Sequence, residues 1–444
     1  MEKTLEFKEQ FIKSFDDFEN NLNGGRTPAV HNLRKEAINK FKELSFPSQK
    51  DEEWKYTNLL PLLKHSFSMF SDKINIEQEK IEKYLFDNLK HNLLVFINGK
   101  YSEENSRLLN LPEGVIAGSI STAIKEKNPL IEKHFGKYAN HSNQIFTALS
   151  TAFINDGAFI SVPGGKVVEV PFHILFLTSD GDGDNEIITQ PRNLFIAGKN
   201  SQVTIIEHYV SPKKSVYFTN TVTEVVAGEN AVVNHLKLQE ESEKAFHIAR
   251  MEVDQERNSN FTSVLFSNGA NISRNDFNAR FNDEGGECTL NGLFLLEKDQ
   301  LFDAHTLIDH AKPNCNSHEH YKGILDDNSR GVFNGKVLVR PDAQKTNAFQ
   351  ENNNILLSDN ALINTKPQLE IFADDVKCSH GATIGQLDEE AKFYLNSRGI
   401  GDEAAKTILL HAFASDVTSS IKIEPVRNYL GNIISERFNQ DKLK

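Results

Sequence analysis

The sequence predicts a mainly β protein with a parallel β-helix at its centre and helical regions at both ends. Two observations lead to this fold. Runs rich in β-forming residues fill the chain from about residue 156 onward, and small polar turns interrupt them at a near-regular interval of about 30 residues. These turns are 198–200, 228–230, 258–260 and 285–287. A fixed repeat of this length indicates a solenoid.

The same observations predict three domains. Residues 1–155 form an N-terminal helical and mixed region, 156–385 the parallel β-helix core, and 386–444 a C-terminal helical region. The first region contains an amphipathic helix over 30–44, where apolar residues recur at steps of three and four. A strand is expected over 93–98, and the pattern from there to about residue 150 predicts no single element.

Within the core, each repeat holds two or more strands and almost no helical pattern. The expected strands are 204–210, 216–226, 231–238, 261–266 and 290–296. We expect 352–354, three consecutive asparagines, at a corner where a β-helix can stack asparagines. The alternative is an antiparallel sandwich, whose turns would recur every 8–12 residues. Periodicity favours the solenoid, although it does not determine how the strands pair.

Three short helices are expected at the C-terminal end. The first covers 388–396, with Asp388 as its N-cap and Gly399 as its stop. The second begins at Gly401-Asp402 and runs to about Ala414, and Pro425 suits the first position of a third. Helices in this place can cap the open end of a solenoid or dock a partner.

Composition excludes several classes of function. The chain has 444 residues with 49 basic and 62 acidic side chains, and a net charge of −13 argues against nucleic acid as the main partner. Apolar runs are too short to span a bilayer, and no signal-peptide core is visible. Three cysteines in so long a chain suggest a reducing compartment, so we expect a cytosolic protein.

Motifs for nucleotide, acyl-transfer and zinc-ribbon chemistry are absent from the sequence. No Gly-Lys pair is followed by Ser or Thr, so the chain has no Walker A loop. No Gly-x-Ser-x-Gly elbow and no Cys-x-x-Cys occur. The chain therefore cannot be an ATPase of the Walker A class by itself.

Cys378 and His380 are the strongest candidates for chemistry. They lie two residues apart in a predicted strand, so both side chains share one face while Ser379 points away. A thiolate beside an imidazole suits iron–sulfur or zinc chemistry better than magnesium or calcium chemistry. The structural alternative is a buried apolar cysteine next to a hydrogen-bonded histidine.

A second, denser group of candidate ligands occupies 18 residues. Its members are Asp303, His305, Asp309, His310, Cys315, His318 and His320. One hypothesis is a metal site or a transient iron relay, although the spacing matches no closed zinc pattern. The other is a set of surface polar residues on consecutive strands. Asp374-Asp375 gives no acid–base couple, because adjacent strand residues point to opposite faces.

Several linked motifs resemble the core of the SufB/SufD family, which builds iron–sulfur clusters. They are 331–335 (GVFNG), 343–346 (AQKT), 356–358 (LLS), 366–371 (KPQLEI), 374–385 (DDVKCSHGATIG), 393–395 (FYL) and 397–400 (SRGI). The segment 52–57 (EEWKYT) resembles the N-terminal region of the SufD branch in particular.

The resemblance implies a right-handed parallel β-helix that forms a heterodimer with a SufB-like paralogue through the end of the β-helix. It also implies a SufC-like ABC ATPase on the C-terminal helices, in agreement with the missing Walker A loop. By the same resemblance, His380 with Cys378 would hold iron or a nascent cluster shared with the paralogue. His310 and Cys315 look family-like and are weaker candidates.

One departure separates this chain from the SufB type. SufB-type chains resemble this one but carry a cysteine where 352–354 stands here, so this chain lacks their principal thiol. We therefore predict a non-catalytic SufD-like subunit of an assembly scaffold, with a transient cluster or iron in the complex and none tightly bound to the lone chain. Without its paralogue the chain could pair with itself. The alternatives are a zinc-binding or structural β-helix interaction protein and, less favoured without a signal peptide, a polysaccharide enzyme.

Overall fold

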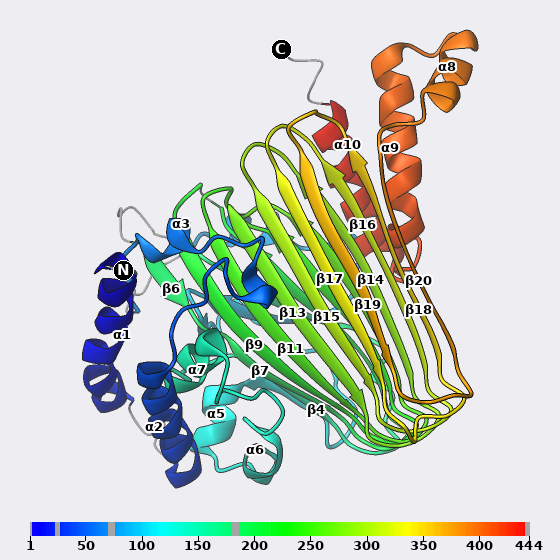
Figure 1. Ribbon diagram of the computed structural model, residues 1–444. Coiled ribbons are helices and arrows are strands. Elements are labelled where there is room, and N and C mark those ends of the chain that lie inside the picture. Colours follow the sequence, from blue (N-terminus) through cyan, green and yellow to red (C-terminus); the bar gives the residue numbers. More distant parts are fainter. Residues whose placement is uncertain (1, 23–26, 70–75, 180–185, 213, 440–444) are drawn as a thin grey trace.

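The chain winds into a parallel β-solenoid whose two sheets face each other across a filled lumen (Figure 1). This computed structural model describes residues 2–22, 27–69, 76–179, 186–212 and 214–439. Successive core strands alternate between the sheets, and each pairs with the strand one turn earlier. We name the sheets after their last strands, the β20 sheet and the β19 sheet.

The β20 sheet contains, in spatial order, β2 (Lys100–Tyr101), β1 (Asn92–Ile97), β5 (Phe172–Leu177), β8 (Gln202–Val210), β10 (Val232–Glu240), β12 (Asn260–Asn268), β14 (Glu287–Leu296), β16 (Asn316–Leu325), β18 (Asn347–Leu356) and β20 (Lys377–Gly385). The β19 sheet contains β3 (Ile116–Ser119), β4 (Ala158–Val162), β7 (Arg192–Ala197), β9 (Tyr217–Ala227), β11 (Phe246–Gln255), β13 (Ile272–Phe281), β15 (Leu301–His310), β17 (Arg330–Val339) and β19 (Leu362–Ile371), with β6 (Ile187–Thr189) beside β9.

The long strands are parallel and stacked in register, which confirms the solenoid over the antiparallel sandwich. The first residues of successive turns lie beside one another, so that one turn takes 27–31 residues; they are Gln202, Val232, Asn260, Glu287, Asn316, Asn347 and Lys377. Side chains alternate along each strand between the lumen and the outer surface. Luminal aromatic rings stack between strands, as Phe294 and Phe302 do at 4.4 Å.

The expected position of the corner asparagines is wrong. Residues 352–354 lie inside β18, where Asn352 and Asn354 are buried in the lumen and Asn354 Nδ2 donates to Asn352 Oδ1 at 2.7 Å. The corners use Asn200 and Asn230 instead, both with φ of +56°. Asparagine tolerates this left-handed backbone better than most residues. The Asn230 amide also donates to Asn200 Oδ1 at 2.8 Å.

Helices of the N-terminal region cover the outer face of the first strands of the β19 sheet (Figure 1). The helices of this region are α1 (Glu2–Asn21), α2 (Pro28–Glu43), η1 (Glu52–Trp54), α3 (Leu60–Leu63), α4 (Gln78–Glu82), α5 (Ile120–Lys125), α6 (Pro129–His134) and α7 (Ile145–Ala152). Of these, α4 packs instead on β1 and β5 of the β20 sheet, and η1 lies over β13. Helix α2 confirms the amphipathic helix expected over 30–44. Phenylalanines such as Phe11 and Phe153 pack in a cluster that reaches Phe218 on β9 and Phe246 on β11.

The three C-terminal helices are confirmed as α8 (Glu389–Ser397), α9 (Asp402–Thr418) and α10 (Glu424–Asn439). The Asp388 carboxylate caps α8 by accepting the backbone N–H of Glu390 and Ala391. Helices α9 and α10 pack their apolar faces on the outside of the β20 sheet, through residues such as Leu410 and Leu430. They therefore do not cap the open end, and α8 projects away without a buried residue (Figure 1).

Among the described residues, no helix is both long enough and apolar enough to cross a membrane.

Candidate functional site at the open end of the solenoid

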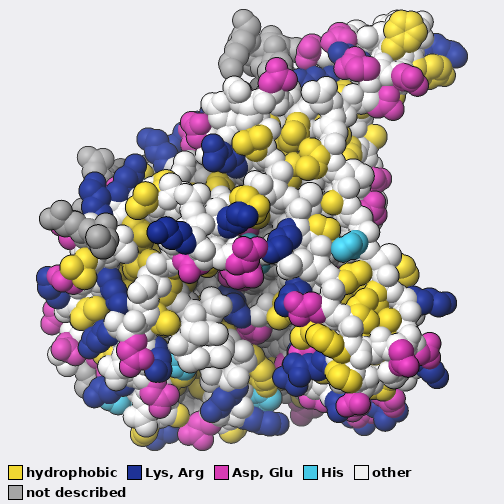
Figure 2. Space-filling model, viewed as in Figure 1, with side chains coloured by type: hydrophobic (Ala, Val, Ile, Leu, Met, Phe, Trp, Pro, Cys, Tyr) yellow, Lys and Arg dark blue, Asp and Glu magenta, His cyan; other side chains and the backbone are white. Residues whose placement is uncertain are grey.

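The last turn of the solenoid leaves its strands unpaired on one side. β19 and β20 are the terminal strands of their sheets, so each presents backbone N–H and C=O groups along a free edge. Large apolar side chains are exposed around this edge, namely Phe349, Leu362, Ile371, Phe372 and Ile384. Figure 2 shows hydrophobic side chains gathered over β18–β20. An exposed apolar surface beside a free strand edge is typical of a protein-binding site.

Cys378 and His380 both lie on β20, at the mouth of the lumen. Their register partners on β18 are Ala348 and Gln350, which are buried in the lumen, so the two side chains belong to luminal rows. Ser379 is paired with the exposed Phe349 and lies on the opposite face. The expected sharing of one face is confirmed. His380 is exposed, and no hydrogen bond or ion pair joins it to another described residue.

The Cys378 thiol lies in a half-buried position that favours its neutral form. Burial raises the pKa of this thiol, and a backbone hydrogen bond at Ala348 opposes the rise. Lys377 is the neighbour of Cys378 on the strand and points to the other face, so its charge gives the thiolate little help. A metal ion or a cationic partner must therefore supply the stabilisation that a thiolate ligand needs.

The second group of candidate ligands does not form one site. Asp303, His305 and Asp309 lie on the outer side of β15, and His310 on its luminal side. Strand β16 carries His318 and His320 on the outer face of the other sheet. No group of three or more His, Cys, Asp or Glu within the described part of the chain could hold a metal ion. The hypothesis of a single metal site in this group is wrong, because the two strands belong to opposite sheets.

His310 and Cys315 are both buried: His310 lies on β15, two strands in from the edge of the β19 sheet, and Cys315 directly precedes β16 of the β20 sheet. The His310 ring places Nε2 at 2.9 Å from Ser317 Oγ, and burial lowers the pKa of this histidine to about 4. Burial raises the pKa of the Cys315 thiol to about 11. Both residues thus favour their neutral forms at neutral pH.

Two family models match adjacent parts of the chain. Residues 177–413 match the family model described as the SUF system FeS cluster assembly, SufBD core domain, and residues 5–174 match the SufBD protein N-terminal region. The chain is 34% identical over 424 residues to an iron-sulfur cluster assembly SufBD family protein of Synechocystis, covering 94% of this chain and 93% of that protein. It is 29% identical to the iron-sulfur cluster assembly protein SufD of Escherichia coli, over 88% of this chain and 89% of the relative.

The chain belongs to the SufBD family of iron–sulfur cluster assembly proteins. The SufD protein of Bacillus subtilis is 27% identical over 98% of both chains. The resemblance to the SufB/SufD family is therefore confirmed over nearly the whole length of the sequence.

Residues 52–57 of this SufBD chain cross four strands of the β19 sheet, and we call this segment the strap. The Arg274 guanidinium of β13 lies over the Trp54 ring, with Arg274 Cζ 3.8 Å from the centre of that ring. Glu53 Oε2 lies 3.0 Å from His305 Nδ1 on β15, and Glu52 Oε1 lies 2.5 Å from Lys366 Nζ on β19. The strap therefore ties the N-terminal region to the last turn.

Charge pairing makes the centre of this strap an ion cluster. Burial alone would lower the pKa of His305, but the adjacent Asp303 carboxylate raises it to about 9. Burial would likewise raise the pKa of Asp303, yet the charges of Arg274 and His305 bring it down to about 2. His305 is a cation that holds Glu53 to the sheet, and we assign it no metal.

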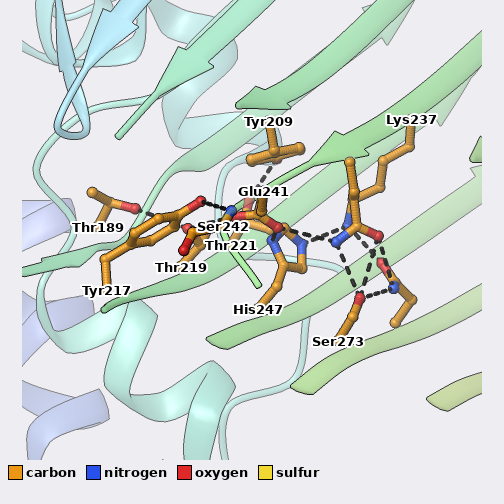
Figure 3. A network of polar contacts seen from close by, with 12 residues as sticks. Thr189, Tyr209, Tyr217, Thr219, Thr221, Lys237, Glu241, Ser242, His247 and Ser273 are labelled. Atoms are coloured by element: carbon orange, nitrogen blue, oxygen red, sulfur yellow. Dashed lines mark hydrogen bonds and ion pairs between the residues drawn. The ribbon is translucent and has the colours of Figure 1, made fainter. Parts of the chain in front are cut away.

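The middle of the lumen in this SufBD chain holds a network of polar and charged side chains (Figure 3). Glu241 Oε2 lies 2.7 Å from His247 Nδ1, and His247 Nε2 lies 3.0 Å from Lys237 Nζ. Lys237 also donates to Asn275 Oδ1 at 2.7 Å, while burial lowers the pKa of its ammonium to about 8. A cavity of about 40 Å³ adjoins this network, which is room for water.

Sequence reasoning missed two luminal residues near the open end, Glu319 on β16 and Gln350 on β18. They lie in the same row as His380, one register step apart. The repeat of about 30 residues could have found them, because counting back from His380 reaches Gln350 and then the region of Glu319. Because the turns vary from 27 to 31 residues, such counting can miss the true partner by a residue. An error of one residue assigns a luminal side chain to the outer surface.

Proposed function

We propose that this chain is the SufD-like subunit of a SufBCD-type scaffold complex. Its open end would meet a SufB-like paralogue, and Cys378 and His380 would contribute to a site for iron or a nascent cluster shared with that paralogue. One observation carries the proposal: the solenoid ends in free, apolar strand edges, and the thiol and imidazole lie on the last of these strands.

The chain supplies too few ligands for a closed metal site by itself. Within the described residues, only Cys378 and His380 bring soft ligands to the open end, whereas iron–sulfur and zinc sites generally use four. The missing ligands must come from the paralogue or from the cargo. The cluster is then a transient substrate of the interface, and the lone chain holds no tight cofactor. A second copy of this chain could cover the same edge when the paralogue is absent.

Helices α8–α10 supply the proposed docking surface for a SufC-like ABC ATPase. Phe393 and Tyr394 are exposed on α8, a helix that buries none of its residues against the rest of the chain. The sequence has no Walker A loop of its own, so ATP binding must be supplied by a partner. In this role the chain is a non-catalytic scaffold. Its three free thiols support a reducing compartment such as the cytosol.

The test of the cluster site is co-expression with a SufB-like paralogue and a SufC-like ATPase, followed by anaerobic purification. We expect His380→Ala to abolish bound iron and acid-labile sulfide while all three chains still co-purify. His318→Ala is the matched control, because this exposed histidine lies on the outer face of β16 and stacks on Phe349 at 5.3 Å. Normal iron and sulfide in the His380→Ala complex would refute the proposed site. Stoichiometric zinc in the lone chain would favour a zinc-binding protein instead.

The test of the docking surface is a double substitution, Phe393→Glu with Tyr394→Glu. Two carboxylates on an exposed helix should leave the fold intact but prevent an apolar contact, so the ATPase should be lost from the complex while the paralogue remains. Leu5→Glu changes an exposed apolar residue on α1 and serves as the control. Co-purification of the ATPase with the double variant would place its docking surface elsewhere.

A further inference from the structure

A row of three polar side chains runs from the buried lumen to the open end. Glu319 on β16 is the register partner of Gln350 on β18, which in turn is the register partner of His380 on β20. Parallel strands lie about 4.8 Å apart, so Gln350 is the direct neighbour of both other residues. Glu319 and Gln350 are each 2% exposed, whereas His380 lies at the surface.

Only one end of the Gln350 amide has a partner. Its Nε2 donates a short hydrogen bond to Glu319 Oε2. Its Oε1 is buried and accepts no hydrogen bond. A buried acceptor without a donor costs free energy, so this oxygen is available for a donor that comes within reach.

Packing fixes where this amide lies. Gly335 on β17 faces Gln350 across the lumen, and a Cβ atom there would come within 2.3 Å of Gln350 Nε2. The glycine therefore makes the space that the amide occupies. Any larger residue at 335 would displace the group that bonds to Glu319.

The ionised form of Glu319 determines which end of the amide it binds. A carboxylate accepts hydrogen bonds and donates none, so it selects the NH₂ group of Gln350 and leaves Oε1 on the free side. No ion pair of the described residues includes Glu319. Its neighbours are the Thr306 hydroxyl, the Cys288 thiol and the Tyr321 hydroxyl. The Gln350 amide is thus the donor to Oε2 of this carboxylate.

Histidines that bind metals generally donate their second ring N–H to an acceptor, which fixes the tautomer and the orientation of the ring. His380 has no such acceptor among the described residues, and Gln350 Oε1 is an unused acceptor in the adjacent strand. We propose that Gln350, oriented by Glu319, accepts the N–H of His380 and so determines which imidazole nitrogen faces the metal cargo. Gln350 and Glu319 are positioning residues in this scheme.

The metal-binding part of this scheme rests on the proposed function, but the tautomer can be measured without metal. The measurement is two-bond ¹H–¹⁵N NMR on the full-length chain labelled at histidine, above the pH at which the ring is protonated. The signal of exposed His380 is identified by its loss in His380→Gln. The same chain in urea gives the tautomer ratio of a free imidazole.

We expect folded wild type to favour one tautomer of His380. In Gln350→Leu the ratio should shift by about threefold to tenfold towards the value in urea, as expected for the loss of one hydrogen bond. Glu319→Gln should shift it in the same direction by less, since an amide no longer selects one end of Gln350. Asn354→Leu removes another buried luminal amide from β18 and should leave the ratio unchanged. An identical ratio in wild type and Gln350→Leu, or a wild-type ratio equal to that in urea, would overturn the proposal.

A second measurement separates this inference from the proposed function. In the complex with the paralogue, Gln350→Leu should weaken iron binding about 10- to 100-fold, the usual cost of losing the acceptor behind a histidine ligand. If the His380 tautomer shifts in Gln350→Leu and iron binding is lost in His380→Ala, both the positioning role of Gln350 and the proposed cluster site are supported. Should the tautomer shift while His380→Ala retains iron normally, the positioning pair is supported and the proposed cluster site fails.

Discussion

The middle of the lumen and its open end are built from the same repeat, yet they treat a buried carboxylate in opposite ways. In the middle, Glu207 accepts hydrogen bonds from Tyr209, Thr223 and His235. Burial raises its pKa, but the bonds and the charges of His235 and Lys237 outweigh burial and leave the pKa below its ordinary value. At the open end, burial raises the pKa of Glu319 to about 7, and no cation offsets it.

This difference separates a region of paired charges from a region that keeps unpaired polar groups. A polar network in which every charge is paired stabilises the closed turns and fixes their register. The open end combines an acceptor without a donor at Gln350 with an exposed imidazole at His380 and free strand edges. Polar groups without hydrogen-bond partners and unpaired strand edges are expected where a protein binds a partner or a substrate.

The largest effect should follow from breaking the middle network. Glu207→Leu removes the acceptor shared by His235, Tyr209 and Thr223, so we expect the free energy of unfolding to fall by about 3–5 kcal/mol. The measurement is the urea midpoint followed by circular dichroism at pH 7.5. Glu319→Leu is the matched control, since it makes the same change in the same sheet where no ion pair is lost. Equal losses in both variants would show that the two regions do not differ as described.

A smaller effect of opposite sign should come from the open end. The pKa of Glu319 is raised from 4.5 to about 7 in the folded chain. The folded state then binds more protons than the unfolded state between these values, so stability falls as pH rises from about 4.5 to 7. Glu319→Gln removes this pH-dependent loss of stability. The variant should be more stable than wild type by up to about 3 kcal/mol at pH 8, with little difference at pH 4.5. Melting temperatures of wild type and variant at both pH values test this, and a destabilised variant at pH 8 would contradict it.

The smallest of the three effects concerns the strap that holds the last turn from outside. The pKa of His305 is raised from 6.5 to about 9, chiefly by Asp303 against the effect of burial. Its contribution is complete below pH 6.5 and is lost as pH rises through about 9. His305→Gln should therefore cost about 1–3 kcal/mol at pH 6 and much less at pH 10. Thermal unfolding at the two pH values measures the difference, and a cost independent of pH would exclude a charged His305.

Sequence reasoning reached the fold and the principal pair because both follow from short-range patterns. The spacing of turns gave the solenoid, and the alternation of a strand gave Cys378 and His380 a common face. Sequence reasoning failed where the answer depended on the burial of a residue or on strand register. The asparagines of 352–354 were expected at a corner and lie in the lumen, and of the two hypotheses for the seven candidate ligands of 303–320, the single metal site is wrong because they lie on different faces. Neither error could be seen locally, because one residue of register exchanges inside for outside.

By itself the sequence determined the architecture and the family of this chain, since repeat length, strand alternation and linked motifs are all properties of neighbouring residues. Only the tertiary structure decided that Glu319, Gln350 and His380 form one row and that the strap from residue 52 reaches the last turn. The physical reason is that contacts between turns join residues about 30 positions apart, and the strap joins residues 314 positions apart. Which of these meet depends on the length of every intervening turn.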